Sequence, residues 1–262
     1  MSALARLAIL ALALAAPLWA EEAPWYQVEV IAFLQPDLSG REGHPPAPRL
    51  DYPEPLRFVV PPPAAPGRDA RLAALMVPAH LRDRDAAALP EPFSPLPGEA
   101  WQLRPAAARL ARADGFRVLF HAAWVQPAAG KKSTPWVHVS GGSPLAEGVR
   151  ELEGALRIWQ GRFLHLEARL WRAEPPAPGE EGRVALPPPP RRPLSAELIQ
   201  LGVEPPPTVA TGPLAARVDL LAQSRTVSPG RLVYLDHPRL GVLALVTPLA
   251  SEGDPQGETA RQ

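Results

Sequence analysis

The side chains most able to do chemistry gather in one stretch, residues 151–171, where carboxylates, guanidinium groups, an imidazole and indoles alternate with apolar residues. Glu151 and Glu153 are two residues apart, so on a strand they share one face, near Arg169. Two carboxylates can serve a glycosidase, but next to an arginine this pattern is far more often a salt-bridged hairpin. The stretch therefore indicates charged recognition groups and no catalytic pair.

Motifs of the common catalytic and metal sites are absent from the sequence. The six His residues have neither HExxH nor HxH spacing, and without Cys there is no thiol nucleophile and no thiolate metal site. Ser140 and Ser143 flank two glycines, which indicates a turn and no G-x-S-x-G elbow. His121, inside an apolar strand, is predicted to be a buried neutral imidazole hydrogen-bonded to backbone. The residues predict a binding protein that is not an enzyme, with no metal and no cofactor.

Polar and apolar residues alternate with a period of two, and this pattern predicts that these side chains lie on a β-hairpin. One parity is apolar and consists of Leu152, Leu156, Ile158, Leu164, Leu166, Ala168 and Leu170. The predicted loop has three residues, 160–162, with its glycine at positive φ. This register places Glu153 opposite Arg169. It also places Arg157 opposite His165. Because an isolated hairpin is marginal in water, more strands and a cover for the apolar face are required.

Other segments read as strands because they alternate or are apolar on both faces. They are 25–34, 116–125, 136–139, 218–227, 232–235 and 240–247, the last three predicted to form a meander. The first and last are predicted to lie inside the sheet. One helix is predicted at 105–113, because Pro105 suits a helix start and Gly115 a helix end, and a second short one at 71–76.

The expected fold class is α+β. We expect a largely antiparallel sheet of about seven strands, one or two short helices packed on it, and long Pro-rich loops. The 37 Pro residues crowd into loops at 36–66, 78–98 and 174–193. Within the last of these, residues 174–192 are predicted to be a flexible insertion with no part in a core, dispensable for folding.

Residues 1–20 are typical of a secretory signal peptide, with a cation at Arg6, an apolar run and cleavage after Ala20. The apolar run is shorter than the ~20 residues that cross a bilayer, so no membrane anchor is expected after cleavage. The predicted location is the periplasm. The rest is predicted to form one domain, 21–250, and a disordered tail, 251–262. Lys and Arg total 27, as do Asp and Glu, and this balance argues against nucleic-acid binding.

Four phrases of the sequence resemble the CsiV family of periplasmic peptidoglycan-binding proteins. They are WYQVEVIAF, GFRVLFHAAW, LEGALRIWQGRFLHLEARLW and QSRTVSPGRLVYLDHPRLGVLALVTPL. The resemblance implies binding to peptidoglycan. It also implies support of cell-wall synthesis through an outer-membrane lipoprotein that activates a bifunctional penicillin-binding protein. The family has no catalytic motif to carry over.

The predicted ligand-binding residues lie on the polar parity of the hairpin and are Arg157, Trp159, His165, Arg169 and Trp171. Aromatic rings suit the C–H faces of sugars, and the Arg fork suits carboxylates. An alternative is that the aromatic side chains are covered by other parts of the chain and pack in a core, which applies to Trp159, Phe163 and Trp171. The Arg residues can likewise be solvated, or pair with Glu153 and Glu167. An alternative function is a periplasmic protein–protein adaptor that docks through its Pro-rich loops without binding peptidoglycan. A third is a wall hydrolase.

Overall fold

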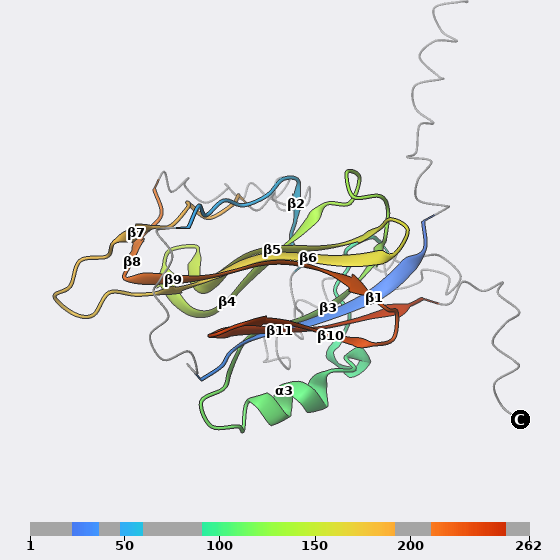
Figure 1. Ribbon diagram of the computed structural model, residues 1–262, viewed down its shortest axis with the longest axis horizontal. Coiled ribbons are helices and arrows are strands. Elements are labelled where there is room, and N and C mark those ends of the chain that lie inside the picture. The colour runs from blue at the N-terminus through green and yellow to red at the C-terminus, as the bar shows by residue number, and fades with distance from the viewer. Residues whose placement is uncertain (1–22, 37–47, 60–90, 192–210, 250–262) are drawn as a thin grey trace, which may run out of the picture.

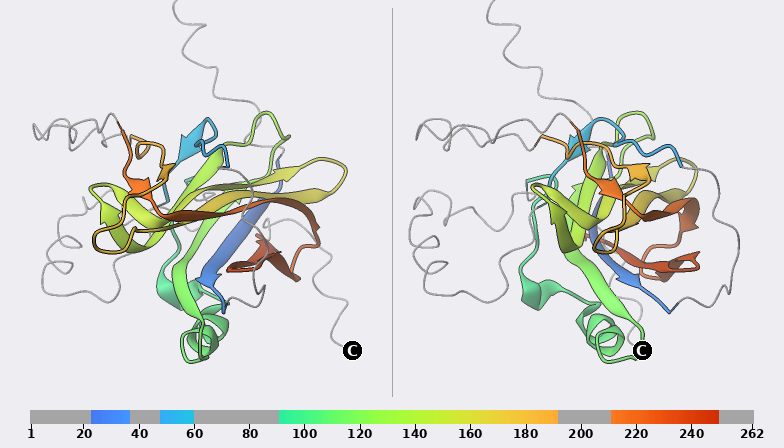
Figure 2. Two further views of the ribbon diagram at one scale, coloured as in Figure 1. Left: turned by 60° about the vertical axis from the view of Figure 1, so that its left-hand side comes forward. Right: turned by 90° about the vertical axis from the view of Figure 1, so that its left-hand side faces the viewer.

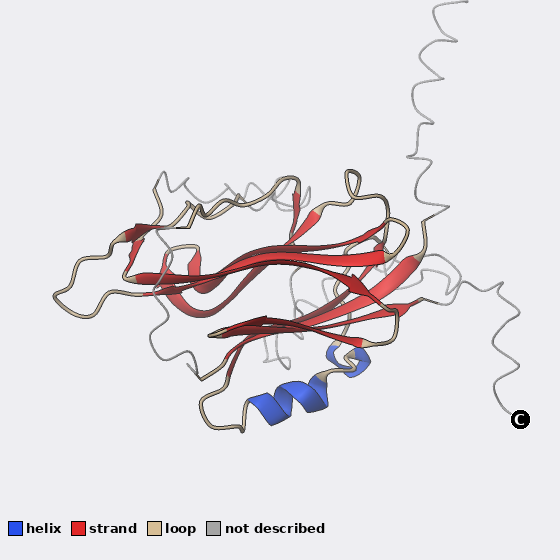
Figure 3. Ribbon diagram, viewed as in Figure 1, coloured by secondary structure: helices blue, strands red, loops and turns tan. Residues whose placement is uncertain are grey.

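The computed structural model describes residues 23–36, 48–59, 91–191 and 211–249, and strands dominate them (Figures 1 and 3). Three predicted segments lie outside these residues. They are the signal peptide at 1–20, the second helix at 71–76 and the disordered tail at 251–262. No helix in the described ranges is long and apolar enough to cross a membrane.

Two sheets lie face to face. One contains β1 (Trp25–Leu34), β3 (Arg117–Pro127), β10 (Leu232–His237) and β11 (Leu240–Pro248), in the spatial order β10-β11-β1-β3. The other contains β2 (Leu56–Arg57), β4 (Trp136–Ala146), β5 (Val149–Gln160), β6 (Leu164–Glu174) and β9 (Arg217–Val227), in the order β2-β4-β5-β6-β9. Neighbouring strands are antiparallel except β2 and β4. A separate pair joins β7 (Val184–Ala185) and β8 (Leu214–Ala215).

The expected α+β class is wrong, because the described fold is mostly β. The apolar parity of the hairpin is covered by the four-stranded sheet and not by a helix. Both sheets contribute to one core, to which Leu156 and Leu166 of the hairpin and Val30 and Trp124 of the other sheet belong, each fully buried. Two amphipathic sheets bury each other's apolar faces, so no layer of helices is needed between them.

The second half of β1, from Val30 onward, is apolar on both faces because it is covered on both faces. It lies between β11 and β3, and β11 lies between β10 and β1, as the sequence predicted for both strands. Val28 and Val30 point into the core between the sheets. Ile31 and Phe33, of the opposite parity, pack with Leu103 and Leu110 on the outer face of the four-stranded sheet.

The helix α3 (Arg104–Leu110) lies against that outer face, preceded by the 3-10 turn η2 (Gly98–Ala100) (Figure 2). A buried carboxylate holds its start in place. Glu29, 1% exposed, accepts hydrogen bonds from the backbone N–H groups of Gln102 (2.6 Å) and Leu103 (2.9 Å). Nε2 of His121 lies 2.8 Å from the same carboxylate, so the predicted backbone partner of this imidazole is wrong.

The hairpin keeps the predicted parity, but its register is shifted by two residues. Its loop is 161–163, which places Arg157 opposite Glu167, Trp159 opposite His165 and Glu153 opposite Trp171. The predicted pairing of Glu153 with Arg169 is therefore wrong. The observed register has the advantage of an opposite-charge pair and an aromatic pair directly across the strands.

The loop glycine is needed for space, not for its φ angle. Gly161 is absent from the positive-φ glycines of the described residues, contrary to the prediction. A Cβ at this position would lie 2.9 Å from the ring of Trp159, closer than side chains tolerate.

The predicted meander is divided between the sheets. β9 pairs with β6 in the five-stranded sheet, whereas β10 and β11 pair in the four-stranded sheet. The turn at 228–231 therefore crosses from one layer to the other. Alternation along each strand is the same in either arrangement, so the sequence pattern does not distinguish them.

The described part of the Pro-rich stretch, residues 174–191, takes part in a core, contrary to the expectation. β7 pairs with β8, and Leu186, 4% exposed, packs in a second cluster with Val149 and Trp171. Loss of this segment would uncover that cluster, so we expect its deletion to destabilise the fold.

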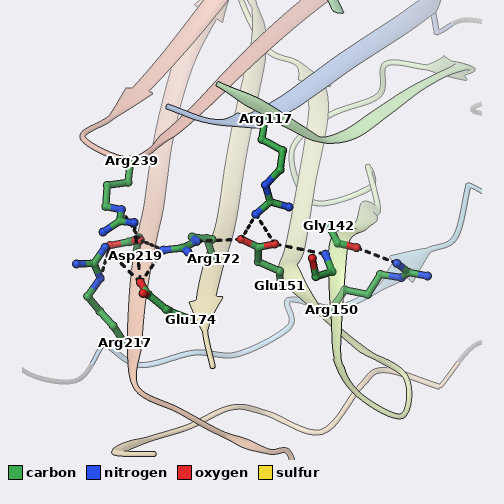
Figure 4. A network of polar contacts seen from close by, with 10 residues as sticks. Arg117, Gly142, Arg150, Glu151, Arg172, Glu174, Arg217, Asp219 and Arg239 are labelled. Carbon is green, nitrogen blue, oxygen red and sulfur yellow. Dashed lines mark hydrogen bonds and ion pairs between the residues drawn. The ribbon is translucent and has the colours of Figure 1, made fainter. Parts of the chain in front are cut away.

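A charged network joins the two sheets at one end of the sandwich (Figure 4). Glu151 of β5, with a side chain 5% exposed, accepts hydrogen bonds from Nη2 of Arg117 on β3 at 2.6 and 2.7 Å. Nε of Arg172 on β6 donates to the same carboxylate at 3.2 Å. Nη1 of Arg172 reaches Asp219 on β9 at 3.2 Å, and Arg217 and Arg239 surround that carboxylate. The predicted contact of Glu151 with Arg169 is replaced by these partners.

Replacing Glu151 should make the fold both weaker and less sensitive to acid. Burial by itself would raise the pKa of Glu151, but hydrogen bonds from Arg117 and Arg172 outweigh burial and hold the pKa below its ordinary value of 4.5. Glu151 therefore stabilises the fold fully above about pH 4.5, and this stabilisation is lost as the pH falls through the folded pKa. Glu151→Gln should cost on the order of 3 kcal/mol at pH 7, because Arg172 is left buried without this charged partner.

Urea unfolding from about pH 7 to pH 3 measures both effects. The variant should lose less stability than the parent over the acidic part of this range. Glu180→Gln, a change of the same kind at an exposed loop position, is the control and should match the parent. Parallel pH profiles for Glu151→Gln and the parent would contradict the role given to this carboxylate.

Candidate functional site

Four of the five predicted ligand-binding residues lie together on the outer face of the five-stranded sheet. With their neighbours they form a surface that we call the hairpin face. It consists of Lys131, Trp136, Arg157, Trp159, His165, Glu167 and Arg169. It lies on the opposite side of this sheet from the core, because its β5 and β6 residues have the parity opposite to the buried Leu and Ile side chains.

Arg157 is fixed within the hairpin face by three kinds of contact. Its Nε and Nη2 donate to Glu167 at 3.1 and 2.8 Å, and its Nη1 donates to the backbone carbonyl of Lys131 at 3.0 Å. Its guanidinium also lies 4.3 Å from the ring centre of Trp136. With a side chain only 13% exposed, Arg157 has few donors left for a ligand.

Glu167 is held as a carboxylate by two cations. The Nζ of Lys131 lies 3.3 Å from it, in addition to the bonds from Arg157. Burial alone would raise the pKa of Glu167, but the hydrogen bonds and charges of Arg157 and Lys131 outweigh burial and lower the pKa. This carboxylate is therefore ionised at neutral pH and is unsuited to act as a general acid.

Arg169 differs from Arg157 although both lie over the same indole. Its side chain is exposed, and its guanidinium lies 5.4 Å from the ring centre of Trp136. Among the described residues it has no hydrogen-bond or ion-pair partner. Its N–H fork is therefore available to a carboxylate in solution.

Trp159 and His165 stack across the hairpin. Their ring centres are 4.1 Å apart and their planes are inclined by 10°. The Nζ of Lys131 lies 5.3 Å from the centre of the Trp159 ring. Both aromatic residues are half-buried, and the indole contacts protein groups along much of its surface.

Trp171 is not part of the hairpin face. It is 1% exposed and packs edge-on against Tyr52 at 4.8 Å, in the cluster that contains Leu186. Its alternative role in a covered core is the one that the structure shows. Phe163, for which a core position was also considered, is 54% exposed at the hairpin tip.

Sequence reasoning missed Lys131 and Trp136, which complete the hairpin face. Trp136, 3% exposed, begins β4, and β4 neighbours β5 because only two residues connect them. That short connection was the available signal, since it predicts an antiparallel pair and places Trp136 beside the hairpin.

A serine, a histidine and a glutamate meet elsewhere, but in an order that does not suit catalysis. Glu153, fully buried, accepts hydrogen bonds from Oγ of Ser140 at 2.8 Å and from the hydroxyl of Tyr52 at 3.1 Å. Nε2 of His138 lies 3.0 Å from it. The carboxylate lies between serine and imidazole, whereas nucleophilic catalysis needs the imidazole between the other two. Burial, followed by the charge of Glu153, raises the pKa of Tyr52 and keeps its hydroxyl protonated as a donor.

The hydrogen bond from Tyr52 to Glu153 fixes segment 48–59 over the sheet.

Among the described residues, no group of three or more His, Cys, Asp or Glu side chains is arranged to hold a metal ion. The hairpin face, with the exposed guanidinium of Arg169, is therefore the candidate site.

Arg157 and Arg169 should differ in their effects on stability. Arg157→Ala should destabilise the protein by about 1 to 3 kcal/mol, because it leaves Glu167 without its closest donors. Arg169→Ala should cost less than about 1 kcal/mol, the usual value of an exposed cation–π contact. Urea midpoints of the two variants, measured beside the parent, check this difference. Equal midpoints would show that the contacts of Arg157 do not stabilise the fold.

Comparison with models of known protein families assigns the chain to one family. The family model described as "Peptidoglycan-binding protein, CsiV" matches residues 3–249, so the chain belongs to the CsiV family. The resemblance seen in the sequence is thereby confirmed. No curated protein and no solved structure matched the chain.

Proposed function

We propose that this protein is a non-enzymatic periplasmic factor that binds peptidoglycan through the hairpin face and supports cell-wall synthesis. The observation that carries the proposal is the guanidinium of Arg169, exposed and without a hydrogen-bond or ion-pair partner in the described part of the chain. Peptidoglycan is rich in carboxylates, and a guanidinium can meet a carboxylate with two parallel N–H donors. Membership of a peptidoglycan-binding family supports the same ligand.

The surroundings of Arg169 support a role in binding rather than in folding. The indole of Trp136 underlies the guanidinium and restricts its motion, so less side-chain entropy is lost when a ligand binds. Arg157 lies over the same indole while its own donors are occupied. One arginine thus organises the surface and the other is left to contact the ligand.

The absence of enzymatic activity is proposed from the state of four buried or half-buried carboxylates. Glu29, Glu151, Glu153 and Glu167 each accept two or more hydrogen bonds from other protein groups. A general acid or base must instead be free to exchange a proton with a substrate. Zymography on peptidoglycan gels should therefore show no clearing by this protein.

Action through partners rests on the family resemblance. The proposed partners are an outer-membrane lipoprotein activator and the bifunctional penicillin-binding protein that it activates. The periplasmic location rests on the signal peptide predicted at residues 1–20. A protein–protein adaptor without affinity for the wall remains the rival function. It predicts a specific crosslinked envelope protein and no pelleting with the wall polymer.

Purified sacculi test the proposed function directly. The protein should pellet with sacculi at low salt, and Arg169→Ala should weaken binding about tenfold or more. This expectation follows because a hydrogen bond to a charged group contributes about 1.5 to 3 kcal/mol, and about 1.4 kcal/mol corresponds to tenfold in affinity. The double variant with Arg157→Ala should bind no better than the single one.

Arg109→Ala is the matched control, since it removes the same charge from α3, on the opposite side of the molecule. It should bind as the parent does. A parent protein that stays wholly in the supernatant would reject peptidoglycan binding. A folded Arg169→Ala variant that pellets like the parent would remove the hairpin face as the site.

A further inference from the structure

The aromatic rings of the hairpin face are already covered by protein groups. Trp136 is 3% exposed beneath Arg157 and Arg169, with the guanidinium centres 4.3 and 5.4 Å from its ring. Trp159 stacks on His165 at 4.1 Å and has Lys131 at 5.3 Å. A sugar recognised by stacking must lay its C–H face flat on an open ring, because the negative face of the ring attracts the C–H groups. Trp136 offers no such face, and on Trp159 the stacked imidazole of His165 already occupies one face.

Phe163 is the exposed aromatic ring nearest to this surface, but it lies at the tip of the hairpin. It is 54% exposed, and the guanidinium of Arg162 lies 5.4 Å from its ring centre. A single phenylalanine at a loop tip is a small platform for a glycan chain.

The charge of this surface favours anions instead. The hairpin face has three cations, Lys131, Arg157 and Arg169, and one carboxylate, Glu167, which pairs with the first two; Arg162 adds a fourth cation at the hairpin tip. Arg162 and Arg169 have no hydrogen-bond or ion-pair partner in the described ranges. The whole chain has equal numbers of basic and acidic residues, so this excess is local. At the other end of the sandwich, by contrast, carboxylates pair with Arg172 and Arg217 (Figure 4).

A strip of short side chains lies beside Arg169 on the neighbouring strand. Ala222, Ser224 and Thr226 of β9 are exposed and lie opposite Arg169, Glu167 and His165 in turn. The strip spans four residue steps, or about 13 Å along the strand. An extended peptide of about four residues has the same length. The hydroxyls of Ser224 and Thr226 can donate to and accept from peptide amides.

We infer that the hairpin face recognises the stem peptides of peptidoglycan through their free carboxylates, and not the sugars of the glycan. In this arrangement the stem peptide lies along the β9 strip, and one of its carboxylates receives the N–H fork of Arg169. The inference rests on the proposed function, because it assigns the part of the same ligand that the same surface contacts. Binding of this kind weakens with added salt, since exposed charges are screened.

Three forms of the wall polymer test the inference with the full chain. They are intact sacculi, sacculi whose carboxylates have been converted into neutral amides with carbodiimide and ammonia, and glycan strands from which an amidase has removed the stem peptides. We expect binding to intact sacculi and a loss of at least tenfold for each of the other two.

The outcomes separate this inference from the proposed function. Equal binding to all three polymers, or full binding to the stripped glycan, would overturn the inference and leave peptidoglycan binding intact. Loss on stripping without loss on amidation would also overturn it, because the carboxylates would then be dispensable. No binding to intact sacculi would reject the proposed function and the inference together.

Two variants test whether the stem peptide binds along the β9 strip. Ser224→Tyr fills the strip without changing charge, at an exposed strand position where tyrosine is well tolerated. It should lower affinity for intact sacculi about tenfold while the circular dichroism spectrum and unfolding midpoint stay those of the parent. Phe163→Ala removes the open ring and should leave binding unchanged. The reverse result, loss with Phe163→Ala and parental binding with Ser224→Tyr, would show that a sugar stacks at the tip and would overturn the inference.

Discussion

Contact between the apolar faces of two sheets is the constraint on which the rest of the structure depends. Each fully buried Leu, Ile or Val in this interface contributes about 1.5 to 3 kcal/mol relative to an exposed position. Leu156 and Ile158 of the hairpin are fully buried because the four-stranded sheet lies over them. Since alternate residues of a strand point to opposite faces, the same packing directs Arg157 and Trp159 outward. The hydrophobic core thus determines where the hairpin face lies.

Three buried carboxylates of the described residues position chain segments. Glu29 holds the residues that lead into α3, Glu153 holds segment 48–59, and Glu151 joins the two sheets through Arg117 and Arg172. A buried carboxylate is tolerated only where several donors satisfy it, and removing one donor is costly. The acids that could have suggested an active site are therefore committed to structure, which agrees with membership of a peptidoglycan-binding family.

Arg157 and Arg169 lie on the same surface but differ in their contacts, because different residues lie opposite them on the neighbouring strands. Arg157 and Arg169 lie over the same indole, but only Arg157 has a carboxylate directly across the hairpin. The residues opposite Arg169 are Ala155 on β5 and Ala222 on β9. These short side chains cannot satisfy a guanidinium, so Arg169 faces solvent and remains able to meet a ligand.

The sequence by itself determined which residues share a face of each strand, that β1 and β11 lie inside a sheet, that one short helix precedes β3, and that the chain resembles the CsiV family. Alternation and apolar character are local properties, so a single sequence reveals them. The tertiary structure alone decided the division into two sheets, the hairpin register, the burial of Trp171 and the exposure of Phe163. These depend on contacts between residues far apart in the chain, such as Trp171 with Tyr52 and Glu151 with Arg117. Alternation is unchanged by a two-residue shift or by a change of partner sheet, so the pattern carries no information about either.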